Sequence, residues 1–349
     1  PINIVFCDCC KTAHQRYQVS KKILFNDKYH YRAKATGVVL QGFKNLINDY
    51  IKKYGNIDGL KVLDIGCNDG SLLDFFKEKG AKTYGIEPTM AAIEAQKNHE
   101  VIKNYFDEEN VKLLIKNFGE FDIITFTNVF AHIEDLSSLI ENLKKLMSND
   151  TILIIENHYL GSILKNNQFD TFYHEHPRTY SLTSLSRIAT QLNRNVSELE
   201  FPGRDGGNIR VYISNKKSFT KFEEKIDFIT LFRRLNFNLE QWKINKKIEL
   251  SNYIRAYGPL PAKAFPGRAT ILIKLLGLTE KHISAVYEIK GSIKTGNYVP
   301  GTRIPILPEA SLYELRNQLP IINLAWHIPQ AVRENLIKNN YLAKVVDIK

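Results

Sequence analysis

A glycine-rich turn between an apolar strand and a helix constrains this chain more than any other feature. The turn follows a predicted strand at 61–65, and its glycines let the backbone approach a ligand closely. The turn residues that we expect to bind a cofactor are Asp64, Gly66, Asn68 and Gly70. About twenty residues later Glu87 ends the next predicted strand, where an acidic side chain suits the hydroxyls of a ribose. This order of elements predicts a nucleotide-type cofactor site.

The turn differs from a dinucleotide-binding fingerprint. Its glycines follow the pattern Gly-x-x-x-Gly, whereas the fingerprint is Gly-x-Gly-x-x-Gly. Asp64 precedes the first glycine, and a carboxylate there suits a cationic cofactor and repels a pyrophosphate. The pattern resembles motif I of class I S-adenosylmethionine-dependent methyltransferases. The resemblance implies S-adenosylmethionine as the cofactor, with Glu87 on its ribose.

Apolar and amphipathic segments alternate along most of the chain, which predicts α/β architecture. In the first half we predict strands at 61–65, 82–86, 121–127 and 151–156, and helices at 37–54, 70–79, 90–98 and 136–146. In the second half we predict a long helix at 220–250, strands at 253–258, 285–288 and 324–327, and helices at 269–276 and 329–338. Residues 1–35 are expected to be irregular. The predicted domains are a Cys-containing segment at 1–36, a cofactor-binding domain at 37–195 and a second α/β domain at 196–349.

Composition favours a cytoplasmic protein with a small-molecule substrate. The net charge is +11, but no block of Lys and Arg with interleaved aromatic residues indicates nucleic acid. A diphosphate-bearing small molecule suits this charge equally well. No apolar run approaches the roughly 20 residues of a membrane span, and no secretory signal opens the sequence. The chain begins at Pro1 without a methionine, which indicates a fragment of a longer protein.

The densest group of reactive side chains is the Tyr173-His-Glu-His176 segment. A histidine with a pKa near neutrality, oriented by a carboxylate, is a suitable general base for an acceptor that is a weak acid. The same residues could instead bind zinc or form a solvated loop. His132 follows the predicted strand at 121–127, where it could assist the base or have a structural role.

The N-terminal cysteines have part of a zinc-binding pattern. Cys7 and Cys10 form one Cys-x-x-Cys pair, which supplies half of a four-ligand site. His14 or His30 could complete it. The chain has only four cysteines, which argues against a disulfide scaffold and for a reducing compartment.

Taken together, these segments resemble the sugar C-methyltransferase family, which acts on nucleotide-activated deoxysugars. The resemblance runs nearly the whole length, and its most specific segments are 128–136, 173–176, 206–210, 298–305 and 324–326. Family members have an N-terminal zinc ribbon, a methyltransferase domain and a C-terminal α/β domain, and the latter two flank the sugar nucleotide. The resemblance implies methyl transfer to carbon or oxygen of a nucleotide-linked sugar, in surface polysaccharide or deoxysugar biosynthesis.

The resemblance also implies roles for single residues. His176 would be the leading general base, with Tyr173, Glu175 and His132 around the sugar. Asn128 would join the cofactor-binding residues. The implied substrate-binding residues are Tyr31 (or Tyr29 in its place), Arg210, Lys263, Tyr298 and Arg303.

Two segments depart from the family pattern. The first Cys-x-x-Cys of the ribbon is missing, so Cys7 and Cys10 form a truncated site and zinc is expected in the full-length protein. The segment 256–263 differs from the family's usual Gly-Tyr-Gly-Ala-x-Ala-Lys-Gly. The resemblance therefore does not predict that this chain binds the family's usual nucleotide and sugar. The rival interpretations are a methyltransferase acting on RNA or protein, a non-catalytic nucleotide-sugar binding protein, and an NAD-dependent sugar oxidoreductase. The missing dinucleotide fingerprint argues against the last of these.

Overall fold

The computed structural model describes residues 2–216, 223–315 and 317–349. The chain divides into two compact units. Unit 1 comprises Pro1–Asn166 and His174–Phe228, and unit 2 comprises Asn167–Tyr173 and Ile229–Lys349. Among the described residues, no helix has both the length and the hydropathy of a membrane span.

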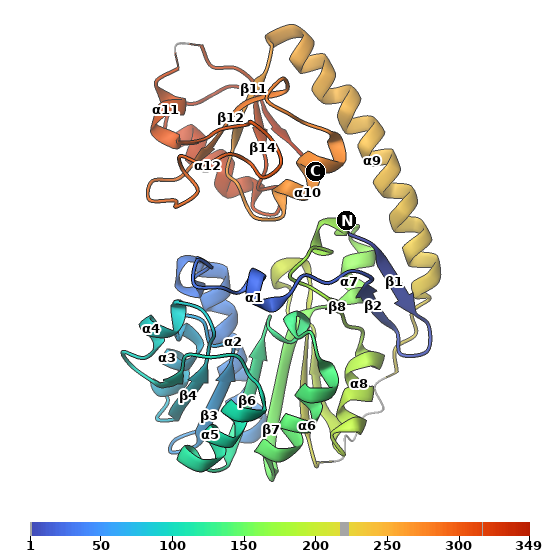
Figure 1. The fold of residues 1–349 in the computed structure, drawn as a ribbon. Helices are drawn as coiled ribbons and strands as arrows, with labels where there is room; N and C mark the ends of the chain where they lie inside the picture. The colour runs from blue at the N-terminus through green and yellow to red at the C-terminus, as the bar shows by residue number, and fades with distance from the viewer. Residues whose placement is uncertain (1, 217–222, 316) are drawn as a thin grey trace. The chain divides into compact units, whose positions relative to one another are not determined.

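The described part of unit 1 is built on a seven-stranded sheet with the order β5-β4-β3-β6-β7-β10-β9 (Figure 1). Its strands are β3 (Lys61–Ile65), β4 (Lys82–Ile86), β5 (Glu100–Ile102), β6 (Phe121–Thr127), β7 (Met147–His158), β9 (Asn195–Glu200) and β10 (Asn208–Ser214). The first five strands in this order, β5, β4, β3, β6 and β7, run parallel to one another. Strand β10 runs antiparallel to both β7 and β9. The sheet therefore extends past residue 195, where we expected the domain to end, because β9 and β10 complete its edge.

Helices cover both faces of this sheet (Figure 1). The helices in the described part of unit 1 are α1 (Lys21–Leu24), α2 (Gly37–Tyr54), α3 (Ser71–Lys77), α4 (Ala91–Ala95), α5 (Glu108–Phe118), α6 (Leu136–Leu146), α7 (Leu160–Lys165) and α8 (Leu182–Gln191). Side-chain caps begin several of them: Asp135 accepts a hydrogen bond from the Ser138 amide at the start of α6, and Ser181 and Ser184 form a capping box on α8. The predicted doubly wound α/β domain is confirmed.

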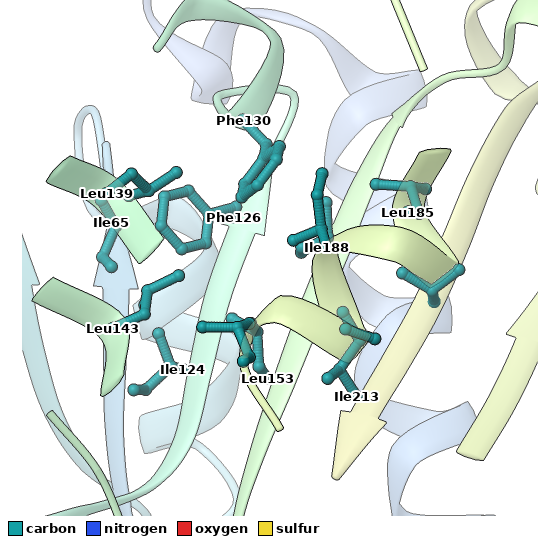
Figure 2. Close-up of a cluster of buried hydrophobic side chains, with 14 of the residues drawn as sticks. Ile65, Ile124, Phe126, Phe130, Leu139, Leu143, Leu153, Leu185, Ile188 and Ile213 are labelled. Carbon is teal, nitrogen blue, oxygen red and sulfur yellow. The ribbon is translucent and has the colours of Figure 1, made fainter. Parts of the chain in front are cut away.

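The strands of this sheet are apolar on both sides because helices bury both faces. In β7, Leu153 and Ile155 pack in one cluster with helices α6 and α8, whereas Ile154 packs in the other cluster with helix α2. Figure 2 shows the first cluster, in which Leu143 and Ile188 lie against the strands. Full burial of a leucine such as Leu143 contributes about 1.5–3 kcal/mol. The continuous apolar stretch that predicted a buried parallel strand is thus explained by two packed faces.

The N-terminal segment is more regular than the sequence indicated. Strands β1 (Ile4–Cys7) and β2 (Thr12–Gln15) form an antiparallel hairpin that pairs with β8 (Arg178–Thr179). The expectation of irregular structure over 1–35 is therefore wrong, because short strands of mixed polarity acquire order by pairing. Within the described residues, no group of three or more His, Cys, Asp or Glu side chains is arranged to hold a metal ion.

The described part of unit 2 contains a parallel five-stranded sheet with the order β13-β12-β11-β14-β15. Its elements are α9 (Phe228–Tyr257, beginning at the last residue of unit 1), β11 (Leu260–Lys263), α10 (Ala269–Leu276), β12 (Ile283–Glu288), β13 (Ile306–Pro308), α11 (Glu309–Tyr313), β14 (Ile321–Asn323), α12 (Pro329–Lys338) and β15 (Val345–Asp347). This is a second doubly wound arrangement, as expected. Its topological switch point lies between β11 and β14, where the chain changes direction across the sheet.

Two strands predicted in unit 2 are wrong. Residues 253–257 continue helix α9, which ends before Gly258, whose φ of +75° is the left-handed conformation that favours glycine. The stretch 324–327 follows strand β14 and does not form it. In both cases the segment is too short for its apolar period to distinguish a strand from a helix or a loop. The first residues of the predicted helix at 220–250 lie outside the described residues.

Candidate active site

The glycine turn after β3 is built from left-handed backbone. Gly66, Asn68 and Gly70 have φ values of +74°, +51° and +83°. The amide of Gly66 donates to the carbonyl of Ile86 at 2.8 Å, which ties the turn to β4. A Cβ atom on Gly66 would lie 2.6 Å from a methyl group of Val129, so no side chain fits there. The predicted turn residues and the loop that begins at Asn128 are therefore close neighbours.

Two carboxylates lie beside this turn. Glu87 follows β4 and is buried, and it accepts hydrogen bonds from the amides of Asn68 at 3.1 Å and Thr89 at 2.9 Å. Asp64 lies in β3 and accepts a 2.7 Å hydrogen bond from the hydroxyl of Thr125. Burial, reinforced by the charge of Glu87, raises the pKa of Asp64 to about 7, although the Thr125 hydroxyl acts to lower it. A cation bound beside Asp64 would therefore stabilise its ionised form.

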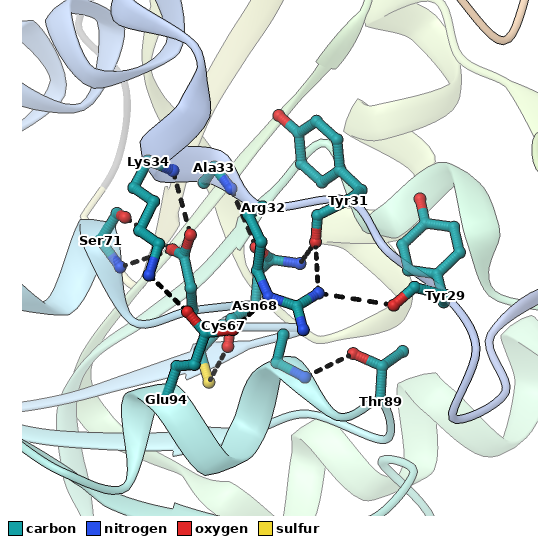
Figure 3. Close-up of polar contacts among 12 residues, drawn as sticks. Tyr29, Tyr31, Arg32, Ala33, Lys34, Cys67, Asn68, Ser71, Thr89 and Glu94 are labelled. Carbon is teal, nitrogen blue, oxygen red and sulfur yellow. Dashed lines mark hydrogen bonds and ion pairs between the residues drawn. The ribbon is translucent and has the colours of Figure 1, made fainter. Parts of the chain in front are cut away.

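A segment from the N-terminal region lies against the turn (Figure 3). The side chain of Asn68 accepts from the amide of Ala33 at 3.0 Å and donates to the carbonyl of Tyr31 at 3.1 Å. Arg32 forms a 2.6 Å ion pair with Glu94 of α4, to which Lys34 is also paired. The backbone of Tyr31 thus reaches the cofactor turn, while its ring is exposed.

The buried polar atoms along the carboxyl edge of the sheet fit a bound cofactor. Thr127 Oγ1, Asn157 Nδ2 and Asn208 Oδ1 are buried and have no hydrogen-bond partner among the described residues. Thr127 is the last residue of β6, Asn157 lies near the end of β7, and Asn208 is the first residue of the antiparallel β10. All three therefore lie at the same edge of the sheet. Asn128, with a φ of +57°, accepts a 3.4 Å hydrogen bond from Asn208. Buried polar atoms of this kind call for a partner, which a polar ligand supplies.

Three histidine rings gather at this edge. His176 is buried, and its ring centroid lies 5.1 Å from that of His132 and 5.3 Å from that of His158. His132 is oriented through its Nδ1 atom, which lies 2.6 Å from the carbonyl oxygen of Glu175. The structure therefore brings His132, Glu175 and His176 together, and the group that orients His132 is the backbone carbonyl of Glu175 and not its carboxylate.

His158 was missed by the sequence analysis. The predicted strand at 151–156 stops short of it, whereas β7 continues to His158, which pairs with Asn208. The available signal was its position: a histidine just after an apolar parallel strand lies at the edge of the sheet where ligands bind.

The other members of the Tyr173–His176 segment are separated. His174 is exposed while His176 is buried, so the two histidines do not share a face. Tyr173 is the last residue of the stretch that belongs to unit 2. The hydroxyl of Tyr29 donates to the carboxylate of Glu175 at 3.3 Å, so Tyr29 contacts the histidine loop.

Arg210 is enclosed by carboxylates within unit 1. Its side chain forms ion pairs with Glu156 at 2.7 Å, Glu200 at 2.6 Å and Asp49 at 3.0 Å. Glu156 is fully buried and also pairs with Arg204 at 2.6 Å. Burial acts to raise the pKa of Glu156, but the two arginines outweigh it and hold this pKa below its usual value.

The candidate substrate residues of unit 2 occupy two places. Lys263 ends β11 at the switch point, and its buried ammonium group lies 2.6 Å from the carboxylate of Glu309. Arg303 lies over the ring of Tyr298, with 5.9 Å between the guanidinium carbon and the ring centroid. Ala264, next to Lys263, has a φ of +63°, which is uncommon for a residue with a side chain and often marks a functional backbone.

The sheet order and the acidic glycine turn define an S-adenosylmethionine-dependent methyltransferase of class I. Residues 33–199 match a family model described as a methyltransferase domain, and residues 204–343 match a model described as a C-methyltransferase C-terminal domain. The first match indicates a methyltransferase domain, and the second shows similarity to the C-terminal domain of C-methyltransferases.

The chain is also similar to several known methyltransferases. The chain is 26% identical over 351 residues to the C-methyltransferase NovU of Streptomyces niveus, covering 96% of this chain and 82% of that protein. It is 29% identical over 101 residues to a ubiquinone biosynthesis O-methyltransferase of Coxiella burnetii, covering 28% of this chain and 43% of that protein. Among solved structures, magnesium protoporphyrin IX methyltransferase from Synechocystis PCC 6803 aligns with a TM-score of 0.39 and 18% identity, over 51% of this chain and 84% of that one.

Proposed function

We propose that this methyltransferase transfers a methyl group from S-adenosylmethionine to a carbon of the sugar in a nucleotide-linked sugar. The observation that carries the proposal is the histidine cluster, in which the ring of His176 is buried beside two other imidazoles. A carbon acid, such as a carbon next to a ketone, must lose a proton before it can attack a methyl group. A buried imidazole with an unprotonated ring nitrogen can accept such a proton.

The residues of unit 1 would hold the cofactor through the turn and the edge. Glu87 would accept hydrogen bonds from the ribose hydroxyls, and the backbone of 66–70 would approach the cofactor closely. Asp64 would favour its positive charge. Asn128 and the neighbouring buried polar atoms would supply further hydrogen bonds. When bound, the cofactor supplies a methyl group on a positively charged sulfur.

The histidine group would act on the acceptor. His176 would take the proton from the acceptor carbon. The electron pair left on that carbon would form the new bond to the methyl carbon as the methyl–sulfur bond breaks and its electrons stay on sulfur. The carbonyl of Glu175 orients His132. The Nε2 atom of His132 can therefore accept a hydrogen bond from the sugar or from His176. Exclusion of water by the buried edge would favour a step in which positive charge disappears.

Unit 2 supports a nucleotide-bearing acceptor. Ligands of open parallel sheets bind beyond the carboxyl ends of the strands at the switch point, where Lys263 lies. The ammonium group of Lys263 is a suitable partner for a phosphate, with Glu309 as its present counter-ion. Tyr298 and Arg303, stacked on one loop, would add an aromatic surface and a second cation.

The test uses S-adenosylmethionine with a carbon-13 methyl group and a panel of nucleotide sugars with and without a 4-keto group. NMR then locates the label in any product. Label on a sugar carbon is the expected result. Label on a sugar oxygen would support the nucleotide sugar as the acceptor but would overturn the assignment of the methyl group to carbon. Transfer to none of the sugars, with cofactor binding intact, would overturn the proposed acceptor class.

A further inference from the structure

A seven-residue stretch of the first half of the chain, Asn167–Tyr173, belongs to unit 2, although unit 1 precedes and follows it in sequence. Three of its side chains contact helix α9: the amide nitrogen of Asn238 lies 2.8 Å from the amide oxygen of Asn167, the ring centroids of Phe169 and Trp242 lie 4.9 Å apart, and those of Phe172 and Phe232 lie 6.3 Å apart. The stretch is therefore packed into unit 2 along most of its length.

Asp170 is the most constrained residue of this stretch. Its side chain is fully buried, and its carboxylate lies 2.8 Å from Lys349 Nζ and 3.7 Å from the guanidinium of Arg268. The indole nitrogen of Trp326 donates to it at 3.2 Å. A buried carboxylate is stable only when charged or hydrogen-bonding partners compensate it, and here three partners do so.

The partners of Asp170 also contact one another. The ammonium group of Lys349 lies 4.0 Å from the ring centroid of Trp326 and 4.5 Å from that of Phe169. The guanidinium group of Arg268 lies over the same indole at 5.6 Å and also donates to the hydroxyl of Thr171 at 3.1 Å. Cations stacked on aromatic rings in this way strengthen a buried ion pair. We call the group formed by Asp170, Arg268, Trp326 and Lys349 the Asp170 clasp.

The clasp lies at the edge of unit 2 where a ligand is expected. Arg268 follows β11 and Trp326 follows β14, and these two strands flank the switch point. The Asn167–Tyr173 stretch is thus anchored at the carboxyl edge of the sheet that also carries Lys263. Beyond the stretch, the chain continues without interruption into the His174–His176 loop.

We propose that Asp170 is a positioning residue for methyl transfer, because the clasp fixes Tyr173 and the backbone from which the histidine loop emerges. This inference rests on the proposed function, since it takes His176 as the general base. Asp170 acts through the loop and has no contact with the reacting atoms. Loss of the carboxylate would leave two cations without their counter-charge, and the stretch would lose its anchor. A displacement of reacting groups by about 1 Å can slow an enzyme about a hundredfold.

The experiment compares Asp170→Asn with the full-length wild-type chain. We expect kcat to fall about tenfold to a hundredfold, with the dissociation constant of S-adenosylmethionine unchanged by calorimetry. Lys349→Met should produce a similar loss, and Lys349→Arg should restore most of the rate because the charge returns. The matched control is Glu249→Gln, which removes an ion pair with Lys246 on helix α9 and leaves the clasp intact.

Hydrogen–deuterium exchange supplies a readout that needs no acceptor. The amides of 172–176 should exchange faster in Asp170→Asn than in the wild type at equal folded fraction. A variant that loses thermal stability but keeps its kcat and loop exchange would overturn the proposal. If Asp170→Asn does not fold, Lys349→Met decides, because it leaves the carboxylate with Trp326 and Arg268. Failure of the wild type to methylate any nucleotide sugar would refute the proposed acceptor, whereas the exchange result would still decide the role of the clasp.

Discussion

The Nδ1 atom of His132 lies 2.6 Å from the backbone carbonyl oxygen of Glu175. Because a carbonyl oxygen can only accept, Nδ1 carries the proton, and the Nε2 atom of the neutral ring is left as an acceptor. One hydrogen bond therefore sets both the tautomer and the orientation of His132. It also joins the loop after β6 to the histidine loop, so that the rings of His132 and His176 lie 5.1 Å apart.

The first prediction concerns the base. His176→Ala should lower kcat about a hundredfold or more, because proton removal from the acceptor loses its catalyst. The affinity for S-adenosylmethionine, measured by calorimetry, should stay at the wild-type value. His174→Ala is the matched control, since His174 lies in the same loop but is exposed. Wild-type turnover in His176→Ala would refute the assignment.

A second prediction concerns the turn. Gly66→Ala should lower the free energy of unfolding by about 1–3 kcal/mol, because it adds a methyl group against Val129 and strains a backbone with φ of +74°. Chemical denaturation measures this loss, and calorimetry should show weaker cofactor binding. The double variant Gly66→Ala/Val129→Ala should recover the part due to the clash, with Val129→Ala as its control. No recovery would mean that the backbone alone causes the loss.

The third prediction follows from the pKa of Asp64, which burial raises from 3.8 to about 7. Between these values the folded chain binds a proton that the unfolded chain lacks. The stability contributed by this proton is therefore present below about pH 4 and is lost as the pH rises through 7. Urea denaturation of wild type and Asp64→Asn at several pH values should show a smaller decline in the variant. Parallel pH profiles would contradict this prediction.

The same carboxyl group should couple cofactor binding to proton release. A cationic cofactor favours the ionised form of Asp64, so binding between about pH 5 and 7 should release a proton and tighten as the pH rises. Calorimetry in two buffers with different ionisation enthalpies detects such a release. Asp64→Asn is the control, and equal heats in both buffers for the wild type would exclude the coupling.

The fifth prediction separates a structural from a substrate-binding role for Arg210. Arg210→Met leaves the buried Glu156 with fewer partners and should cost about 3–5 kcal/mol of unfolding free energy. Arg187→Met, at an exposed position of α8, is the control and should cost little. Unchanged stability together with a raised KM for the acceptor would instead return Arg210 to the substrate.

Much of the fold was predictable because local pattern and tertiary packing agree. Helices at 37–54, 136–146 and 329–338 and strands at 61–65 and 121–127 have the predicted bounds. The apolar periods of the three helices are long, and Gly55 and Gly66 follow the ends of α2 and β3. The hairpin at 4–15 and the end of α9 were missed, because a segment of a few residues is too short for its apolar period to distinguish strand, helix and loop.

The sequence by itself determined the turn chemistry, since Asp64, Gly66 and Glu87 lie within one strand–turn–helix–strand unit whose local geometry follows from the residues. It also determined that each half is α/β. Tertiary structure alone decided which histidines meet, that His158 joins His132 and His176, and that Arg210 is enclosed by carboxylates. It alone decided that Asp170 belongs to unit 2. The physical reason is that sheet register and buried charge pairing join residues far apart in the chain, and no local pattern encodes those distances.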